Sequence, residues 1–316
     1  MTKVQRIQPA DHLVQARKNA LVNGSLDRIT HRRDDSKWFD RKLEDPTTLF
    51  VPIWNQKNLI DMQHMKAVKL TPQDVLSFED VDNGIILLGN QNNRTFFAYL
   101  FDTENNPIVN DFAYANASFE DLRRFGPMLD DCDASLLAYA KAIGYWHQRH
   151  RFCGSCGSST SVSKAGHLRS CTNPECGAIH FPRTDPAIIV LVHSEDHCLL
   201  GRQARWPKGV YSTIAGFVEP GESAEQAVLR EVWEEAGIRI DKMSYQSSQP
   251  WPFPSSLMLG FQACAQLQKI RRNDNELEDA KWFSRDTVAE AVAGNSSLKL
   301  PPAFSVSRRL IEDWCK

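Results

Sequence analysis

Four of the eight cysteines lie within 24 positions of one another, and this cluster constrains the fold more than any other feature of the chain. The spacing is C-x2-C followed by C-x4-C, with 14 residues between the two pairs. Four thiolates can close a tetrahedral zinc shell that has no open position, which makes the site structural. The metal-binding free energy then stabilises a segment too short to form its own core. We therefore predict one structural Zn²⁺ per chain, bound by Cys153, Cys156, Cys171 and Cys176.

Two disulfides are the alternative for this cluster, and they are typical of secreted proteins. The first 20 residues are charged and lack the apolar region of a signal peptide, and no run approaches the roughly 18 apolar residues that span a membrane. The last residues are not a Ser-Lys-Leu-type peroxisomal signal. We therefore expect an intracellular, cytoplasmic protein without membrane contact, and zinc rather than disulfides. The neighbouring His167 and His180 are expected to be ordinary polar residues, and the other four cysteines ordinary core thiols.

The length of 316 residues and the 42% hydrophobic content predict about two domains. A net charge of −2 argues against binding to nucleic acid or anionic membranes through an overall positive field, although a local basic groove is compatible with it. From Leu49 to Asp102, short apolar runs alternate with turn residues and predict β-strands. Helical spacing of apolar residues from Ser118 to Arg151 predicts one or two helices that lead into the cysteines, and the run at 187–193 predicts a strand.

A helix predicted from about Ser223 to Ala236 carries a group of acidic residues. At about 100° per residue, Glu231, Glu234 and Glu235 fall within one arc of roughly 100°. Like charges at i,i+4 destabilise a helix by about 0.2–0.5 kcal/mol per pair, so this face needs solvent or a cation. A solvated acidic face is the alternative, but the apolar stripe of the helix begins directly beside Glu235. Hard cations such as Mg²⁺ prefer carboxylate oxygens, which favours a metal site.

The residues around this helix predict a fixed geometry. Pro220–Gly221 can form a turn, Ser223 can cap the N-terminus of the helix, and Gly237 can end it in the left-handed conformation. Glu222 and Arg230 are eight residues apart, about two turns, and can pair along the helix to orient the carboxylate that follows. That pair is predicted to be structural.

The segment from Gly216 to Ile238 matches the Nudix box, G-x5-E-x7-R-E-U-x-E-E-x-G-U with U aliphatic, at every fixed position. Seven fixed residues would coincide by chance on the order of once in a million chains of this length. The chain therefore resembles the Nudix hydrolases. The resemblance implies an α/β/α sandwich that hydrolyses a nucleoside diphosphate linked to a further group, with Mg²⁺ or Mn²⁺ held by Glu231, Glu234 and Glu235.

Residues 248–255 read SQPWPFPS, a stiff segment in which prolines alternate with aromatic residues. Such a segment can hold the indole of Trp251 as a platform for a base, or its aromatics can simply fill the core. It resembles the S-Q-P-W-P-F-P-x-S signature that marks the NADH diphosphatases among Nudix hydrolases. The zinc knuckles, the residues HFPRTDP at 180–186 and SRRLI at 307–311 are also similar to that family. The resemblance covers residues from about 150 to 312 closely.

Five substrate contacts follow from this resemblance alone. It implies that Phe181 and Phe217 stack on the nicotinamide or adenine side of the substrate. It also implies that Gln249 and Trp251 line the base pocket, and that Ser307 lies near a second metal or the diphosphate.

An additional carboxylate, Glu276, precedes Trp282 by six residues and matches an acidic residue of the family that looks like a metal ligand or general base. Glu278 and Asp279 are nearby alternatives that can simply be solvated, so Glu276 is preferred. The general base is expected to be Glu234 or Glu276.

The expected reaction is metal-dependent hydrolysis of the diphosphate bond of NADH and NAD⁺ to AMP and nicotinamide mononucleotide, with removal of 5′ NAD caps from RNA as a further activity. One alternative is a Nudix hydrolase that prefers ADP-ribose, FAD or another nucleoside diphosphate derivative. Another is a zinc-ribbon nucleic-acid-binding protein with an inactive Nudix domain, which the complete box disfavours. The resemblance also suggests a homodimer.

The expected fold class is α/β with three parts. A β-rich N-terminal domain occupies residues 1–148, a zinc ribbon occupies residues 149–182, and the Nudix domain occupies residues 183–316.

Overall fold

The computed structural model describes residues 19–22, 26–78, 84–108, 114–273 and 275–316. Within these ranges, no helix is both long enough and apolar enough to cross a membrane. The chain divides into two compact units. The C-terminal unit contains residues 19–22, Asp185–Trp251 and Ser256–Lys316, and the N-terminal unit contains the described part of Asn23–Thr184 together with Pro252–Ser255.

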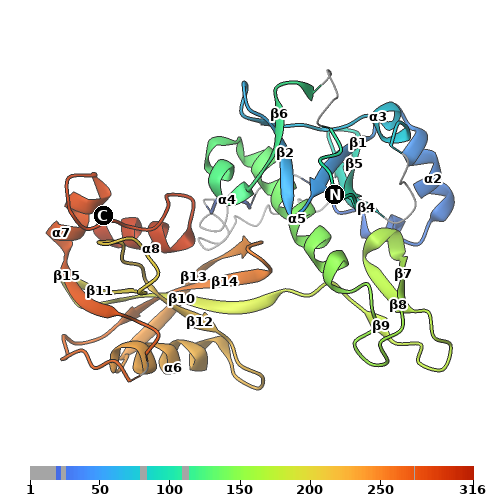
Figure 1. The fold of residues 1–316 in the computed structure, drawn as a ribbon. Helices are drawn as coiled ribbons and strands as arrows, with labels where there is room; N and C mark the ends of the chain where they lie inside the picture. The colour runs from blue at the N-terminus through green and yellow to red at the C-terminus, as the bar shows by residue number, and fades with distance from the viewer. Residues whose placement is uncertain (1–18, 23–25, 79–83, 109–113, 274) are drawn as a thin grey trace, which may run out of the picture. The chain divides into compact units, whose positions relative to one another are not determined.

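A six-stranded mixed sheet forms the centre of the C-terminal unit (Figure 1). The strand order is β13-β14-β10-β11-β15, with β12 paired to β10. Strands β10 and β14 are parallel, and the other pairs are antiparallel. The strands are β10 (Asp185–His193), β11 (His197–Arg202), β12 (Ile214–Phe217), β13 (Lys242–Trp251), β14 (Ser256–Cys264) and β15 (Asp279–Ser284).

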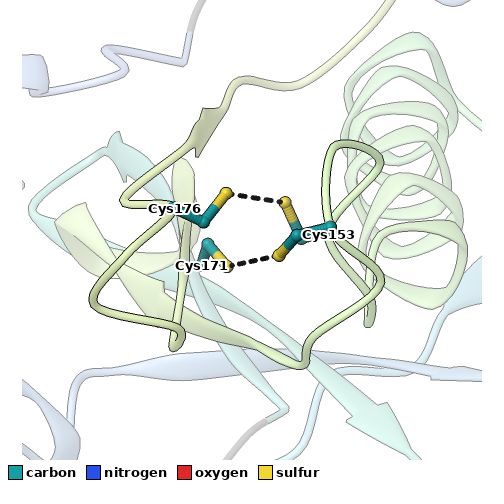
Figure 2. Close-up of side chains that lie close together, drawn as sticks. Cys153, Cys171 and Cys176 are labelled. Carbon is teal, nitrogen blue, oxygen red and sulfur yellow. Dashed lines mark hydrogen bonds between the residues drawn. The ribbon is translucent and has the colours of Figure 1, made fainter.

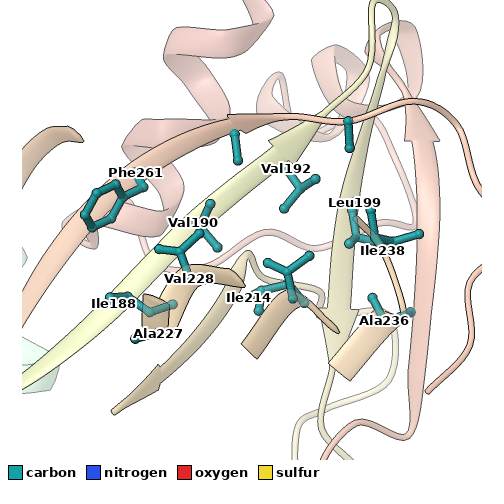
Figure 3. Packing of buried hydrophobic residues seen from close by; sticks show 14 of the residues in the cluster. Ile188, Val190, Val192, Leu199, Ile214, Ala227, Val228, Ala236, Ile238 and Phe261 are labelled. Carbon is teal, nitrogen blue, oxygen red and sulfur yellow. The ribbon is translucent and has the colours of Figure 1, made fainter. Parts of the chain in front are cut away.

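Helices cover both faces of this sheet. Alternate residues of β10 belong to two different cores: Ile188, Val190 and Val192 pack with α6 (Ala224–Ala236), as Figure 3 shows. Ile189 and Leu191 pack with α7 (Arg285–Val292) and α8 (Val306–Cys315). A strand that is buried on both faces needs an uninterrupted apolar run, which explains the sequence AIIVLV. The predicted α/β/α sandwich and the predicted strand at 187–193 are therefore confirmed.

The N-terminal unit contains a second six-stranded mixed sheet, of order β3-β2-β1-β5-β4 with β6 paired to β2. Its one parallel pair joins β1 to β5, and the core includes Phe50, Phe97 and Tyr99. The predicted β-rich character of Leu49–Asp102 is confirmed. The elements are η1 (Thr30–Arg32), α2 (Ser36–Glu44), β1 (Leu49–Trp54), β2 (Lys57–Asp61), β3 (Lys66–Ala67), α3 (Pro72–Leu76), β4 (Ile85–Gln91), β5 (Arg94–Phe101) and β6 (Ala117–Glu120).

The helical prediction for Ser118–Arg151 is confirmed except at its start. Residues 118–120 belong to strand β6, because they pair with β2 and bury Phe119 in the core. The helices that follow are α4 (Leu122–Phe125), η3 (Gly126–Met128) and α5 (Asp131–Arg149). The apolar stripe of α5 is buried through Leu136, Leu137, Ala140 and Ile143.

The cysteine-rich segment follows α5 and forms a small three-stranded sheet, β7-β8-β9. Its elements are β7 (Thr160–Ser163), η4 (Lys164–Gly166), β8 (Leu168–Cys171) and β9 (Ile179–His180). Two buried histidines bind it to the rest of the unit: the Nε2 of His147 on α5 lies 2.7 Å from the Gly166 carbonyl oxygen, and the Nε2 of His167 lies 2.7 Å from that of Leu87. The ribbon and the β-rich sheet therefore form one compact unit.

Candidate functional site

The four cysteine sulfurs converge on one point. All lie within 4.8 Å of one another, with Cys153 Sγ 3.8 Å from Cys176 Sγ and Cys156 Sγ 3.4 Å from Cys171 Sγ. Figure 2 shows Cys171 and Cys176 facing Cys153 across this point. A tetrahedron of sulfurs with Zn–S bonds of about 2.3 Å has edges of about 3.8 Å, so the geometry fits zinc.

The four thiols differ in proton affinity. The backbone N–H of Ser155 lowers the pKa of the Cys153 thiol to about 5, whereas burial raises the pKa of the Cys171 thiol to about 12. Zinc binds thiolates, so its binding would release protons from this cluster. His180 Nε2 lies 3.3 Å from Cys153 Sγ, but it is outside the group of four possible ligands. It therefore contacts the shell from outside.

The acidic helix α6 begins and ends where the sequence predicts. The Ser223 hydroxyl accepts the Gln226 N–H in a reciprocal capping box, and Gly237 ends the helix with a φ of 67°. Glu231 and Glu235 are buried, whereas Glu234 is half-buried. The three carboxylates therefore lie along the boundary between the core and solvent.

Arg230 holds the carboxylates of this helix in place. Its Nε and Nη2 donate to the two oxygens of Glu222 at 2.9 Å each, and its Nη1 donates to Glu231 at 2.7 Å and to Glu234 at 3.1 Å. Nη2 also donates to the carbonyl oxygen of Phe217 at 2.9 Å. The predicted Glu222–Arg230 pair is confirmed, and it fixes α6 to the end of β12.

Gly216 on β12 provides the floor on which Glu231 lies. A Cβ placed on Gly216 would lie 1.9 Å from both Cδ and Oε1 of Glu231, far below the 3.0 Å under which Cβ atoms make essentially no non-bonded contacts. The absence of a side chain at position 216 therefore creates the space that the Glu231 carboxylate occupies. This explains the fixed glycine that begins the box.

The carboxylates face more negative charge than one guanidinium balances. Burial raises the pKa of Glu231, and the charges of Glu234 and Glu276 raise it further, while Arg230 lowers it. Glu276 is therefore close enough to interact with the acidic helix, as its predicted role requires. An all-oxygen, partly buried and electron-rich set of ligands fits a hard divalent cation.

The carboxylate oxygens lie farther apart than the cysteine sulfurs. In the described part of the chain, the cysteine cluster is the one group of three or more His, Cys, Asp or Glu side chains whose ligand atoms lie within 4.8 Å of one another. The Arg230 guanidinium is bound to Glu231 and Glu234 instead. The residues thus fit a divalent cation by their chemistry, because all of the candidate ligand atoms are carboxylate oxygens.

Gln249, predicted to line the base pocket, is completely buried in the C-terminal unit. Its amide nitrogen donates to the carbonyl oxygens of Ala20 and Phe304, and its amide oxygen accepts the N–H of Val306. The side chain therefore connects β13 to the start of α8, and a substrate contact by Gln249 stays a prediction.

Three aromatic side chains were predicted to contact substrate. Phe217, at the end of β12, is 60% exposed, and Phe181 in the N-terminal unit is 67% exposed. The indole of Trp251 is half-buried and stacked on Phe304, with ring centroids 5.3 Å apart and planes at 13°. The carbonyl oxygen of Phe217 accepts a hydrogen bond from Arg230, whereas Phe304 covers one face of the Trp251 indole.

Ser307 is buried, and its hydroxyl hydrogen-bonds with the hydroxyls of Ser212 and Thr213 at 2.9 and 2.8 Å. These contacts join α8 to the segment that precedes β12. Its predicted proximity to a metal or the diphosphate stays a prediction.

The two alternatives to Glu276 have other partners. Glu278 accepts a hydrogen bond from Arg202 at 2.6 Å, and Asp279 accepts one from the Tyr211 hydroxyl at 2.5 Å and pairs with Lys281 at 2.7 Å. They are therefore not simply solvated, and their contacts stabilise the edge formed by β11 and β15.

Two structural features of the site could not be identified from the sequence. One is the contact between Gly216 and Glu231, and the other is the hydrogen bond from Arg230 to the Phe217 carbonyl oxygen. Both join residues of β12 to residues of α6. Only the fixed spacing of the box indicated that they act together.

Sequence models of three domain families match consecutive parts of the chain. The NADH pyrophosphatase-like rudimentary NUDIX domain matches residues 13–146, the NADH pyrophosphatase zinc ribbon domain matches residues 148–181, and the NUDIX domain matches residues 183–303.

The chain is also similar to named relatives. NAD-capped RNA hydrolase NUDT12 of Pongo abelii is 31% identical over 344 residues, which cover 96% of this chain and 74% of that protein. NAD-capped RNA hydrolase NudC of Stutzerimonas stutzeri (strain A1501) is 47% identical over 62% of this chain and 67% of that protein. NUDT12 of Homo sapiens is 38% identical over 60% of this chain, and the match spans 43% of the human protein, less than half its length. A solved NUDIX hydrolase of Nitrosomonas europaea is 20% identical with a TM-score of 0.36, covering 48% of this chain and 97% of that one.

Proposed function

Because this chain belongs to the Nudix hydrolases of the NADH pyrophosphatase type, we propose that it hydrolyses the diphosphate bond of NADH and NAD⁺ to AMP and nicotinamide mononucleotide. We further propose that it removes 5′ NAD caps from RNA, an activity for which the relatives of Pongo abelii and Stutzerimonas stutzeri are named. The observation that carries the proposal is the Glu231 carboxylate, seated on Gly216 and clamped by Arg230.

The proposed ligands of the catalytic cation are Glu231, Glu234, Glu235 and Glu276. The chemistry supplied by bound Mg²⁺ or Mn²⁺ is neutralisation of the diphosphate charge and Lewis acidity at the reacting phosphorus. Arg230 positions two of these carboxylates through its bonds to Glu231 and Glu234.

The reaction needs a general base and a leaving group. Water adds to one phosphorus, its proton passes to Glu234 or Glu276, and the bridging P–O bond breaks so that the bridging oxygen leaves with the other phosphate. Glu276 is suited to this task because its charge interacts with Glu231 while its own side chain is exposed. The substrate contacts proposed for the bases are Phe181, Phe217, Gln249 and Trp251, with Ser307 near the diphosphate.

The experiment is product analysis of the purified full chain with NADH, NAD⁺ and ADP-ribose, each with Mg²⁺, with Mn²⁺ and with chelator. We expect AMP and reduced nicotinamide mononucleotide to form fastest from NADH, and only with metal. Faster cleavage of ADP-ribose would support hydrolase activity but contradict the proposed pocket for the nicotinamide base. No cleavage of any substrate would contradict the whole proposal.

The matched variants are Glu235→Gln and Glu225→Gln, two isosteric changes on the same helix. Glu235 is buried among the proposed ligands, whereas Glu225 is exposed on the first turn. We expect the first change to remove most turnover and the second to leave it intact, with zinc content unchanged in both.

The proposal also includes a homodimer, which the family resemblance suggests. Sedimentation of the full chain at assay concentration tests it, and a monomer that retains full activity would contradict it.

A further inference from the structure

The outer surface of α6 is apolar where a helix of this kind is normally polar. Leu229 and Trp233, spaced i,i+4, are each 46% exposed, although Val228 and Val232 already form the core face of the helix. An amphipathic surface helix buries one stripe and presents polar residues on the opposite side. The packing of α6 therefore does not account for Leu229 and Trp233.

These two residues border a hollow in the surface. It has a volume of about 420 Å³ and is lined by Leu229, Trp233, Ile238, Arg239 and Ile240. The buried Ile238 provides its floor, while the Arg239 guanidinium lies over the Trp233 ring at 5.6 Å from the centroid. An indole and a cation thus share one open depression.

A basic segment is fixed beside this hollow. The Gln268 side chain bonds to both the N–H and the carbonyl oxygen of Arg239, and the Arg271 N–H donates to the Ala236 carbonyl oxygen at 2.8 Å. Lys269 and Arg271 are exposed, and neither they nor Arg239 form an ion pair with any residue that the structure describes. Cations at the end of a helix favour its dipole, but that does not explain an exposed indole.

We propose that the Trp233 surface, defined as Leu229, Trp233, Arg239, Lys269 and Arg271, binds the single-stranded RNA that follows a 5′ NAD cap. An aromatic face on which a base stacks, flanked by cations for the phosphates, is the chemistry of sequence-independent single-strand binding. Glu225, one turn before Leu229, and Asp241, two residues after Arg239, are exposed acids, so we place the RNA toward Lys269 and Arg271.

The surface is joined directly to the proposed site. Trp233 precedes Glu234, and Asn273 donates its N–H to the Glu234 carbonyl oxygen and its side-chain amide to that of Trp233. From Arg271 the chain needs only five residues, at most roughly 18 Å, to reach Glu276. A few nucleotides of single-stranded RNA cover that distance. The inference rests on the proposed function, because it assigns a path to the RNA of a capped substrate.

Binding is measured first, without catalysis. The probe is a fluorescent 5′-monophosphate single-stranded RNA of about 12 nucleotides, added to the full chain in chelator so that nothing is cleaved. We expect Trp233→Ala to weaken binding roughly tenfold, since one base–aromatic stack is lost. We expect Arg239→Glu and Lys269→Glu each to reduce the slope of log affinity against log salt by about 0.7 or more, since a phosphate contact is lost. The matched control is Lys37→Glu, an exposed cation on α2, which should bind as the wild type does.

Turnover then separates this inference from the proposed function. We expect the variants to lose roughly tenfold in kcat/KM on NAD-capped RNA while hydrolysing free NADH at the wild-type rate. Variants that match the wild type in RNA binding and on both substrates would overturn the RNA path while the hydrolase stands. A wild type that binds the RNA through these residues but cleaves no substrate would keep the surface and overturn the proposed function. A change of oligomeric state with unchanged RNA binding would make this surface a contact between copies and overturn the inference.

Discussion

Gly216 and Glu231 lie closer together than any side chain at position 216 would permit. The contact is made between β12 and α6, and it fixes the depth at which the carboxylate sits beside the core. Arg230 then fixes its direction, because one guanidinium joins Glu222, Glu231 and Glu234. The candidate site therefore depends as much on an absent side chain as on charged ones.

We predict that Gly216→Ala lowers kcat on NADH by roughly 100-fold or more. The new methyl group must displace the Glu231 carboxylate, a proposed ligand of the catalytic cation, and misplaced catalytic groups slow a reaction steeply. The control is Gly154→Ala, since no atom lies within 4 Å of the methyl group added there. Steady-state hydrolysis of NADH by both variants provides the measurement. Normal turnover by Gly216→Ala would show that the Glu231 geometry is unimportant.

A second substitution separates the two candidate bases. We predict that Glu276→Gln lowers kcat by roughly 10²- to 10⁴-fold, the usual contribution of a general base, and removes the acidic limb of the pH–rate profile. The comparison is Glu278→Gln, which affects only the contact with Arg202 and should retain turnover. If Glu276→Gln keeps the profile of the wild type, the base is Glu234.

Helix α6 and the zinc ribbon obtain their order in different ways. The helix has a capping box, a left-handed glycine at its end and a buried apolar stripe, so local sequence and core packing agree. The ribbon has three short strands, and at its centre four sulfurs take the place of an apolar core. Its structure must therefore depend on the metal.

We predict that Cys156→Ser, or removal of zinc by a strong chelator, destabilises the N-terminal unit by several kcal/mol and exposes residues 153–180 to proteolysis. The control is Cys132→Ser, since Cys132 lies outside the cluster and is exposed. The expectation that the four cysteines outside the cluster are core thiols is wrong for Cys132 and Cys264, which are both exposed. Metal content, calorimetry and limited proteolysis provide the measurements. A ribbon that resists proteolysis without zinc would contradict a structural role for the metal.

Within the N-terminal unit, two neutral histidines connect the ribbon to the rest of the structure. Arg169 Nη1 lies 2.9 Å from Nδ1 of His147, while His147 Nε2 contacts the Gly166 carbonyl oxygen, so a second proton on His147 would face a guanidinium. Burial lowers the pKa of His147 to about 4, and burial also lowers the pKa of His167 to about 4. The contact between ribbon and sheet therefore requires uncharged imidazoles.

We predict that the N-terminal unit loses stability as the pH falls from about 6.5 toward 4. In this window the unfolded chain binds more protons than the folded one, since the pKa values of His147 and His167 in the folded chain lie below the usual 6.5. Each histidine therefore lowers the free energy of unfolding by about 1.4 kcal/mol per pH unit at most. Calorimetry of the zinc-loaded chain measures the slope. We expect His167→Gln to reduce the slope, because the buried imidazole that takes up a proton on unfolding is removed.

The sequence by itself determined the features that depend on local spacing. The two cysteine knuckles predict one metal site because four thiolates at that spacing satisfy one tetrahedron. The box predicts α6, its cap at Ser223, its end at Gly237 and the Glu222–Arg230 pair, because helical geometry alone brings residues four and eight apart to one side. The apolar run at 187–193 predicts a strand, and the structure shows that it is buried on both faces.

The tertiary structure decided what depends on contacts between distant segments. It seats Glu231 on Gly216, completes the hydrogen bonds of Gln249 with Ala20, Phe304 and Val306, and pairs residues 118–120 with β2 in place of the predicted helix. Local pattern does not encode these contacts, because each partner comes from another part of the chain. Strand pairing and burial are worth more than local propensity, so the packed structure sets the depth of each carboxylate and the partner of each buried amide.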